Sequence, residues 1–258
     1  MYLPTALGVA HGQDCVLMLV IAVSSYTLHS SGRRGWAGAV LALSLFKFHL
    51  LLLFPLALWA AGERRMLRGY LCSAVVLTAF SMVLAGPSGV GHYVHMLTDP
   101  TLSGLNPSPE RTVSVFGLAR SLPWPYLWTA IPLVAGVVLA TRLAVRNAPA
   151  WRWWAASLVG CLLAVPHVYG YDAAVILLAI WLVFAHGETA AAKLTAALCA
   201  TPLPFFAGLG PPPQSGVPAL ALIALLGALA WENMHSPTTA PVESDPVSGE
   251  RAAAAALG

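Results

Sequence analysis

The chain has 258 residues, of which 58% are apolar and 9% are charged, and its formal net charge is +3. Soluble domains carry about 25% charged residues, so this composition excludes an ordinary soluble domain and predicts an α-helical membrane protein. The apolar stretches are continuous and rich in Leu and Ala, whereas the strands of a membrane β-barrel alternate in polarity, so a β-barrel is a poor fit.

Eight apolar segments follow one another along the chain. They cover residues 15–29, 36–60, 69–86, 125–141, 153–166, 173–185, 190–209 and 217–231. A hydrocarbon core of about 30 Å needs about 20 helical residues, and shorter helices are tolerated where their ends open into a protein-lined cavity. We therefore expect an all-α, polytopic transmembrane helical bundle with about seven spans and one re-entrant helical hairpin.

The hairpin is expected at residues 36–60, because a single crossing there would divide the arginines between the two sides of the membrane. With Lys47 left out of the count, a hairpin leaves ten Lys and Arg residues on the cytoplasmic side and two, Arg111 and Arg120, on the outer side. A single crossing gives eight against four. The first distribution fits the positive-inside rule better, so we expect the segment to turn back with Lys47 at its tip.

Two regions differ sharply in composition. Residues 1–231 hold all the apolar segments and are expected to form the transmembrane domain, whereas residues 232–258 are of low complexity. We expect this second region to be a disordered cytoplasmic tail. The long loop from Gly86 to Trp124 is expected on the outer side, together with Asp14 and residues 166–172.

Lys47 is the most informative single residue. A lysine at bilayer depth costs about 2.5–3.5 kcal/mol on insertion scales, so it faces a partner or a watery cavity inside the protein. Two interpretations remain open from the sequence: a structural lysine that pairs with Asp14 or a carbonyl group, or a cation that meets a bound phosphate.

The order of motifs along the chain resembles glycosyltransferase family 87, the polyprenyl-phosphate-mannose-dependent membrane transferases of the GT-C fold. The matching motifs are Gly12-Gln13, a small-residue stretch from Ala37 and Gly38 to Lys47, Asn106-Pro-Ser108, SVFGLAR at 114–120, and PHVYGYD at 166–172. The resemblance covers about residues 5–190. It implies a GT-C-like bundle and an inverting transfer, in which a carboxylate deprotonates the acceptor hydroxyl and polyprenyl phosphate leaves.

The resemblance also implies roles for individual residues. Donor phosphate binding is expected from Lys47, Arg111 and Arg120. Substrate binding is expected from Gln13, His167, Tyr169, Tyr171 and Asp172. The catalytic carboxylate of GT-C enzymes lies in an outer loop upstream of the matched motifs, so we expect an N-terminal half to be missing and the 258 residues alone to be inactive. Asp14 and Asp172 are weak candidates for a substitute base.

The sequence therefore predicts a glycosyltransferase in a bacterial plasma membrane, and the resemblance favours mannose as the transferred sugar. Its partners would be a polyprenyl-phosphate sugar donor and a lipid or glycan acceptor. A transporter or lipid flippase that uses Lys47 and Asp172 as intramembrane charges is the alternative, followed by an inactive structural subunit. We expect no cofactor and no metal, although His92, His95 and Asp99 have a weak metal-like spacing. A basic face suited to nucleic acid is missing from the sequence.

Overall fold

The computed structural model describes residues 2–99 and 111–235, and every regular element in these ranges is a helix. The first half contains α1 (Leu3–Ala10), α2 (Cys15–Ser30), α3 (Arg34–Ala42), the 3₁₀ helix η1 (Leu43–Leu51), α4 (Phe54–Ala60) and α5 (Arg64–Thr98). The second half contains α6 (Val115–Ser121), α7 (Tyr126–Val145), α8 (Ala150–Leu163), η4 (Gly170–Val175), α9 (Ile176–His186), α10 (Ala190–Ala200), α11 (Leu203–Ala207), η5 (Gln214–Gly216) and α12 (Val217–His235). The predicted all-α bundle is confirmed.

Three helical stretches in the described residues are long and apolar enough to cross a membrane alone: Arg64–Met96, Tyr126–Val145 and Gln214–His235. The bent pair Arg34–Leu51 and Phe54–Ala60 makes a fourth if it counts as one span. Other apolar segments that the sequence suggests as spans form shorter helices, such as Cys15–Ser30 and Ala190–Ala200. At 1.5 Å per residue, α10 covers only about half of the hydrocarbon core.

The segment 34–60 turns back on itself, as the distribution of arginines predicts. Its two parts meet at an angle of 109°. At the start of α3, Arg34 Nη1 lies 3.5 Å from Oε2 of Glu63, the residue just before α5, and His29 Nε2 lies 3.2 Å from Oε1 of the same carboxylate. Both ends of the segment therefore lie at one end of the bundle. We call this the arginine-rich end, defined by Arg33, Arg34, Arg64, Arg65 and Arg68.

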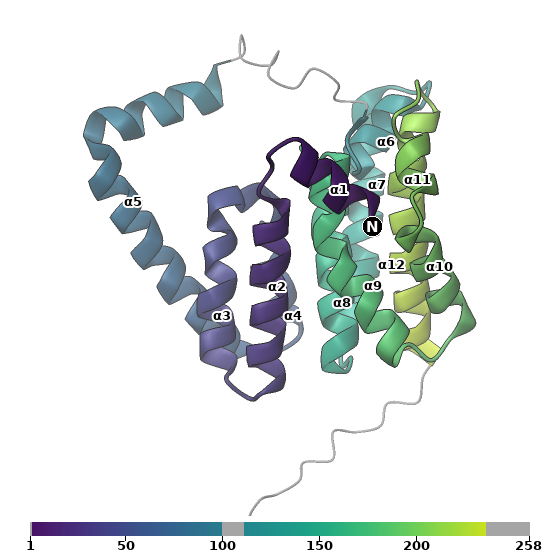
Figure 1. Cartoon of the computed structure of the whole chain (residues 1–258), viewed down its shortest axis with the longest axis horizontal. Coiled ribbons are helices and arrows are strands. Elements are labelled where there is room, and N and C mark those ends of the chain that lie inside the picture. Colours follow the sequence, from purple (N-terminus) through teal and green to yellow (C-terminus); the bar gives the residue numbers. More distant parts are fainter. Residues whose placement is uncertain (1, 100–110, 236–258) are drawn as a thin grey trace, which may run out of the picture.

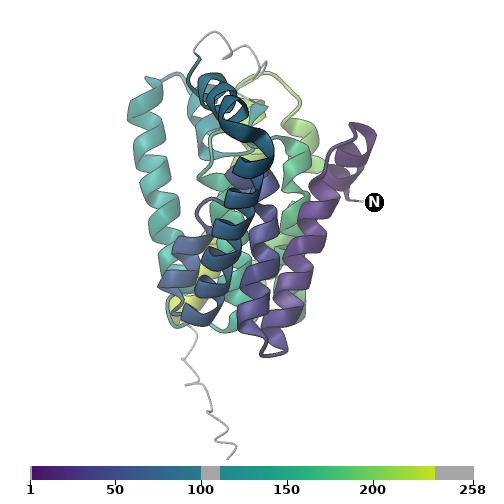
Figure 2. The ribbon, with the colours of Figure 1, turned by 90° about the vertical axis from the view of Figure 1, so that its left-hand side faces the viewer.

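Glycines bring the first leg of the hairpin close to α5. A Cβ atom on Gly38 would collide with the backbone of Met66, and one on Gly69 would collide with the backbone of Gly35. Close backbone approach through small residues is a common way to pack helices in membranes, where burial of apolar surface gives little net driving force. Figures 1 and 2 show α5 at one side of the molecule, next to this leg.

The core of the bundle is α8, whose residues from Trp151 to Leu163 are all buried. Helices α7, α9 and α12 pack around it. By contrast α5 leaves most of its large apolar side chains exposed, among them Val75 and Val83. Such a surface is expected of a helix that faces lipid.

The outer loop that was expected to begin at Gly86 begins later. Gly86 has a φ of 66°, which only glycine adopts readily, and Pro87 follows it. This positive φ bends the chain, and a second helical stretch then continues to Thr98 (Figure 1). The sequence signal at Gly86-Pro87 therefore marks a kink rather than the end of the helix.

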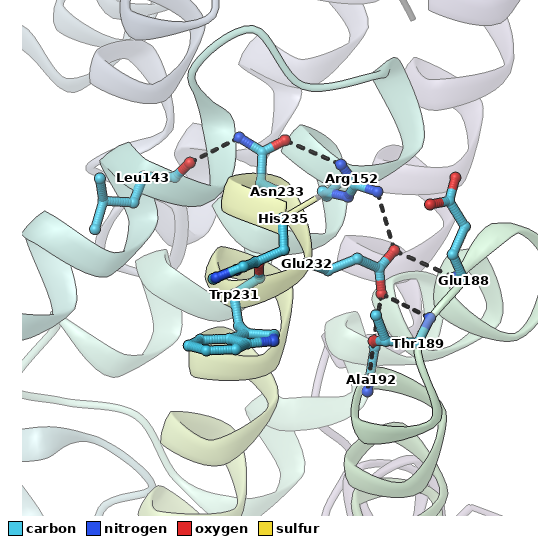
Figure 3. A network of polar contacts seen from close by, with 9 residues as sticks. All are labelled: Leu143, Arg152, Glu188, Thr189, Ala192, Trp231, Glu232, Asn233 and His235. Atoms are coloured by element: carbon cyan, nitrogen blue, oxygen red, sulfur yellow. Dashed lines mark hydrogen bonds and ion pairs between the residues drawn. The ribbon is translucent and has the colours of Figure 1, made fainter. Parts of the chain in front are cut away.

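A buried polar network ties four helices together at the arginine-rich end (Figure 3). Arg152 on α8 forms an ion pair of 3.0 Å with Glu232 on α12, and both side chains are buried. The Glu232 carboxylate also accepts hydrogen bonds from the backbone N–H groups of Glu188 and Thr189 and from the Thr189 hydroxyl. Asn233 accepts a hydrogen bond from Arg152 and donates to the Leu143 carbonyl on α7.

Helix α12 continues to His235, beyond the boundary that was expected at residue 231. The rest of the expected tail, residues 236–258, lies outside the described residues.

Candidate functional site

Lys47 lies at the turn of the hairpin, in a locally irregular backbone. Its φ and ψ of −128° and 52° interrupt the helical geometry of η1. A few residues later Pro55 stands in the first turn of α4, where a proline starts a helix without losing a hydrogen bond. The lysine side chain is only 13% exposed. The hairpin therefore holds a mostly buried ammonium group at its tip.

Two carboxylates from distant parts of the chain hold this ammonium group. Lys47 Nζ donates a hydrogen bond of 2.9 Å to Oδ1 of Asp14, the residue that precedes α2. It also forms an ion pair of 2.7 Å with Oδ1 of Asp172 in η4. The two carboxylates differ in access, because the side chain of Asp14 is 43% exposed and that of Asp172 only 2%. Asp172 is fixed further by its Oδ2, which accepts the backbone N–H of Tyr169 at 3.0 Å.

This cluster of Asp14, Lys47 and Asp172 has a formal charge of −1, since one ammonium faces two carboxylates. An ammonium group has three N–H donors, and one of them donates the hydrogen bond to Asp14. The Lys47 Nζ atom also lies 5.4 Å from the centre of the Tyr171 ring, in the range of a cation–π contact. The Lys47 ammonium group thus contacts Asp14, Asp172 and Tyr171, and of the two carboxylates that of Asp14 is exposed.

Aromatic and imidazole rings extend from the cluster in a continuous series. The ring centres of His49 and His167 are 5.9 Å apart, those of His167 and Tyr169 are 5.1 Å apart, and those of Tyr169 and Tyr171 are 5.7 Å apart. His11, at the end of α1, lies 6.3 Å from Tyr171. Within the described ranges, no group of three His, Cys, Asp or Glu side chains is arranged to hold a metal ion.

A cavity of about 260 Å³ lies next to Tyr171. Its polar lining consists of His11, Arg111, Tyr169 and Tyr171, and among its described lining residues Arg111 is the one cation. Its apolar walls come from α1, α11, α12 and two connecting segments: Leu7, Phe205, Pro218, Val113 and Leu209. A hydrogen bond of 2.7 Å from the Val113 N–H to the Val168 carbonyl holds the segment of Arg111 against residues 166–172.

The structure brings most of the sequence-predicted site residues together. Lys47, Tyr171 and Asp172 meet at the cluster, Arg111 and Tyr169 line the cavity, and His167 belongs to the series of rings. Asp14 pairs with Lys47, which is one of the two interpretations that the sequence left open. His11 is a cavity residue that sequence reasoning did not select, since a histidine at the end of a short helix carries no distinctive signal.

Three other expectations fare differently. The guanidinium group of Arg120 lies over the ring of Tyr126, 4.3 Å from its centre, and Arg120 does not line the cavity. The backbone N–H of Gln13 closes the turn between α1 and α2 on the Gly8 carbonyl, and the role of its side chain stays a prediction. The Asn106-Pro-Ser108 motif lies outside the described residues.

Comparison with known proteins decides the family. The sequence profile of glycosyltransferase family 87 matches residues 1–166, which is more than half of the chain. The chain belongs to glycosyltransferase family 87. No curated protein and no solved structure matches it.

As a member of family 87, the chain is a membrane glycosyltransferase in the general sense that the family defines. The part that matches the family profile includes Asp14, Lys47 and Arg111 and ends before Asp172. Asp172, the buried partner of Lys47, therefore lies beyond the matched region.

Proposed function

We propose that this family 87 protein takes a sugar, for which mannose fits the resemblance, from a polyprenyl-phosphate donor and transfers it to a lipid or glycan acceptor. The observation that carries the proposal is the combination of a small cavity with one cation and a buried lysine–carboxylate cluster beside it. A lipid-linked phosphosugar needs a cation for its phosphate, acceptors for its hydroxyl groups and a position next to the bilayer.

We further propose that this site opens on the extracytoplasmic side of the cell membrane. The arginine-rich end is the cytoplasmic end by the positive-inside rule. The ion pair of Arg34 with Glu63 joins the two ends of the hairpin there, and Lys47 lies at the hairpin's turn. The cluster and the adjoining cavity therefore belong to the outer half of the bundle, where a donor lipid enters sideways from the membrane.

Arg111 is the group best suited to the donor phosphate. A guanidinium group presents parallel N–H donors that match a phosphate, and such charged hydrogen bonds are about twice as strong as neutral ones. Lys47 already faces two carboxylates, so its ammonium group gives the phosphate a second, weaker contact. Arg120 would have to leave the Tyr126 ring to join them.

Carboxylates and aromatic rings serve the sugar in this proposal. Asp14 is exposed enough to accept a hydrogen bond from a hydroxyl group, and Tyr169 and Tyr171 offer ring faces beside it. In an inverting transfer the acceptor oxygen attacks the anomeric carbon, the bond from that carbon to the phosphate oxygen breaks, and a carboxylate takes the hydroxyl proton. Of the two candidate bases, Asp14 has the better access, because Asp172 is buried against Lys47 and the Tyr169 N–H.

The proposal can be tested by donor binding, which does not require turnover. The chain would be reconstituted in lipid nanodiscs, and its affinity for a polyprenyl-phosphate mannose measured. We expect Arg111→Ala to weaken binding about 10- to 100-fold, the usual effect of losing a charged hydrogen bond. Lys193→Ala, an exposed lysine on α10 at the arginine-rich end, is the matched control and should bind like the unchanged chain.

Competition with soluble sugar nucleotides distinguishes the class of donor. A guanosine diphosphate sugar should not displace the lipid donor, because the sequence has no glycine-rich phosphate loop or nucleotide-binding fingerprint. Displacement by that nucleotide, or equal donor affinity of the Arg111→Ala variant and the unchanged chain, would contradict the proposal.

A further inference from the structure

A second and larger cavity extends from the arginine-rich end of the bundle inward to Leu53 and Ala164. Its volume is about 570 Å³, within the usual range of ligand sites. One wall is the second leg of the hairpin, with Leu56 and Trp59, and the other is α7, with Val138. Gly160 and Cys161 of α8 also line it. We call this cavity the α4–α7 groove.

Two arginines stand at one end of the α4–α7 groove. Arg142 and Arg146 line it, one helical turn apart at the end of α7, and both are exposed. Within the described residues neither forms an ion pair, and the described lining holds no acidic side chain. This end of an otherwise apolar groove therefore carries two uncompensated positive charges.

The depth of the groove relative to the membrane follows from its neighbours. Trp59 and Ala60 line the groove and lie just before Glu63, which contacts Arg34. Trp59 is 71% exposed, and exposed tryptophans are enriched at the level of the lipid headgroups. The two arginines thus lie at headgroup depth at the arginine-rich end, while Leu53 and Val138 reach into the hydrocarbon region.

We propose that the α4–α7 groove binds an anionic phospholipid of the leaflet at the arginine-rich end. Arg142 and Arg146 would hold its phosphate, and one acyl chain would lie between the hairpin and α7. An apolar groove with two cations at one end matches an amphiphile with an anionic headgroup. Basic pockets between helices on the cytoplasmic side bind such headgroups. This lipid would support the hairpin that carries Lys47, from the end opposite the donor cavity.

The probe for this site is phosphatidylglycerol, measured by native mass spectrometry of the detergent-solubilised chain against phosphatidylcholine. We expect phosphatidylglycerol to bind more tightly, and Arg142→Ala/Arg146→Ala to weaken its binding about 30-fold. Val138→Trp should also weaken it, because the indole fills the apolar part of the groove without a change of charge. Arg64→Ala/Arg65→Ala removes two exposed arginines of the same end that do not line the groove, and should leave binding unchanged.

Several results would overturn the proposal. Equal affinity for the two phospholipids, or an equal loss in the Arg64/Arg65 control, would mean that any surface cation suffices. An unaffected Val138→Trp variant would mean that no acyl chain enters the groove. Displacement of the lipid by millimolar inorganic phosphate would reveal a site for free phosphate, and displacement by a polyprenyl phosphate would assign the groove to the donor instead.

Discussion

The side-chain ammonium of Lys47 lies 2.7 Å from Asp172 Oδ1 and joins the turn of the re-entrant hairpin to the short helix before α9. The carboxylate is buried and the ammonium nearly so. A buried charge that loses its partner is far more costly than an exposed one, so this contact makes the position of the hairpin depend on a residue from the second half of the chain.

The first prediction concerns the two partners of Lys47. Lys47→Met leaves Asp172 buried without a cation, so it should lower the free energy of unfolding by about 3–5 kcal/mol. Asp14→Asn should cost about 1 kcal/mol or less, because the Asp14 side chain is 43% exposed and solvent screens its charge. Thermal unfolding in detergent checks both, and the double variant Lys47→Met/Asp172→Asn should regain part of the loss. Equal effects of the two single variants would contradict this account.

A second prediction tests the close packing of the hairpin against α5. Gly38→Ala should destabilise the protein by about 1–3 kcal/mol, because the added Cβ collides with the Met66 backbone, which cannot move aside as a side chain can. The matched control is Gly136→Ala on α7, an exposed position with open space around the added methyl group. It should be neutral or stabilising by up to about 1 kcal/mol, since Ala favours a helix. Thermal unfolding of the two variants side by side decides the point.

The hairpin could be predicted from the sequence because the positive-inside rule relates the positions of Lys and Arg residues to the two sides of the membrane. Arg34 and Arg64 can share one side only if the chain between them turns back, and the contact of Arg34 with Glu63 confirms that it does. The need of Lys47 for a partner was equally predictable, because an isolated charge at bilayer depth is costly. Asp14 was named as a possible partner, whereas Asp172 was expected to bind substrate.

Other features could not be predicted, since they depend on tertiary packing between distant segments. Arg152 reads as one more cytoplasmic charge, yet it is buried against Glu232, and nothing in the local sequence of either residue indicates the pair. Phe205 and Pro218 lie far along the chain from His11, and only the fold brings them to one cavity. Gly86-Pro87 correctly indicated an interruption of the helix, but the same two residues can either end a helix or bend it.

The third prediction concerns pH. Burial alone would raise the pKa of Glu63, but the adjacent His29 ring, 3.2 Å away, and the positive charge of Arg34 outweigh it and hold the pKa below its ordinary value of 4.5. A carboxyl group with a lowered pKa in the folded state stabilises the protein fully above its ordinary value, and this contribution is lost as the pH falls through the lowered value. Glu63→Gln should therefore flatten the dependence of thermal stability on pH below about 4.5. If the thermal stability of that variant depends on acidic pH as strongly as that of the unchanged chain, Glu63 is not the cause of the dependence.

The fourth prediction addresses the network of Figure 3. Glu232→Gln leaves the buried Arg152 without its counter-charge and weakens the bonds that reach Thr189, so we expect a loss of about 3–5 kcal/mol. Arg68→Ala, which removes an exposed arginine on α5, should change the free energy of unfolding by less than about 0.5 kcal/mol. Chemical unfolding in mixed micelles measures both, and a similar small effect of the two variants would mean that the network does not hold the helices together.

The central claim is that the lipid-linked donor binds beside Tyr171 at the end of the bundle opposite the arginines. The most direct measurement is photocrosslinking with a polyprenyl-phosphate sugar that carries a photoreactive group near its phosphate, followed by peptide mapping. The account predicts crosslinks to the peptides that contain His11, Arg111 and Tyr169–Tyr171, and their loss when unlabelled donor is added in excess. Crosslinks concentrated instead around Arg142 and Arg146, or equally strong in the presence of excess donor, would contradict it.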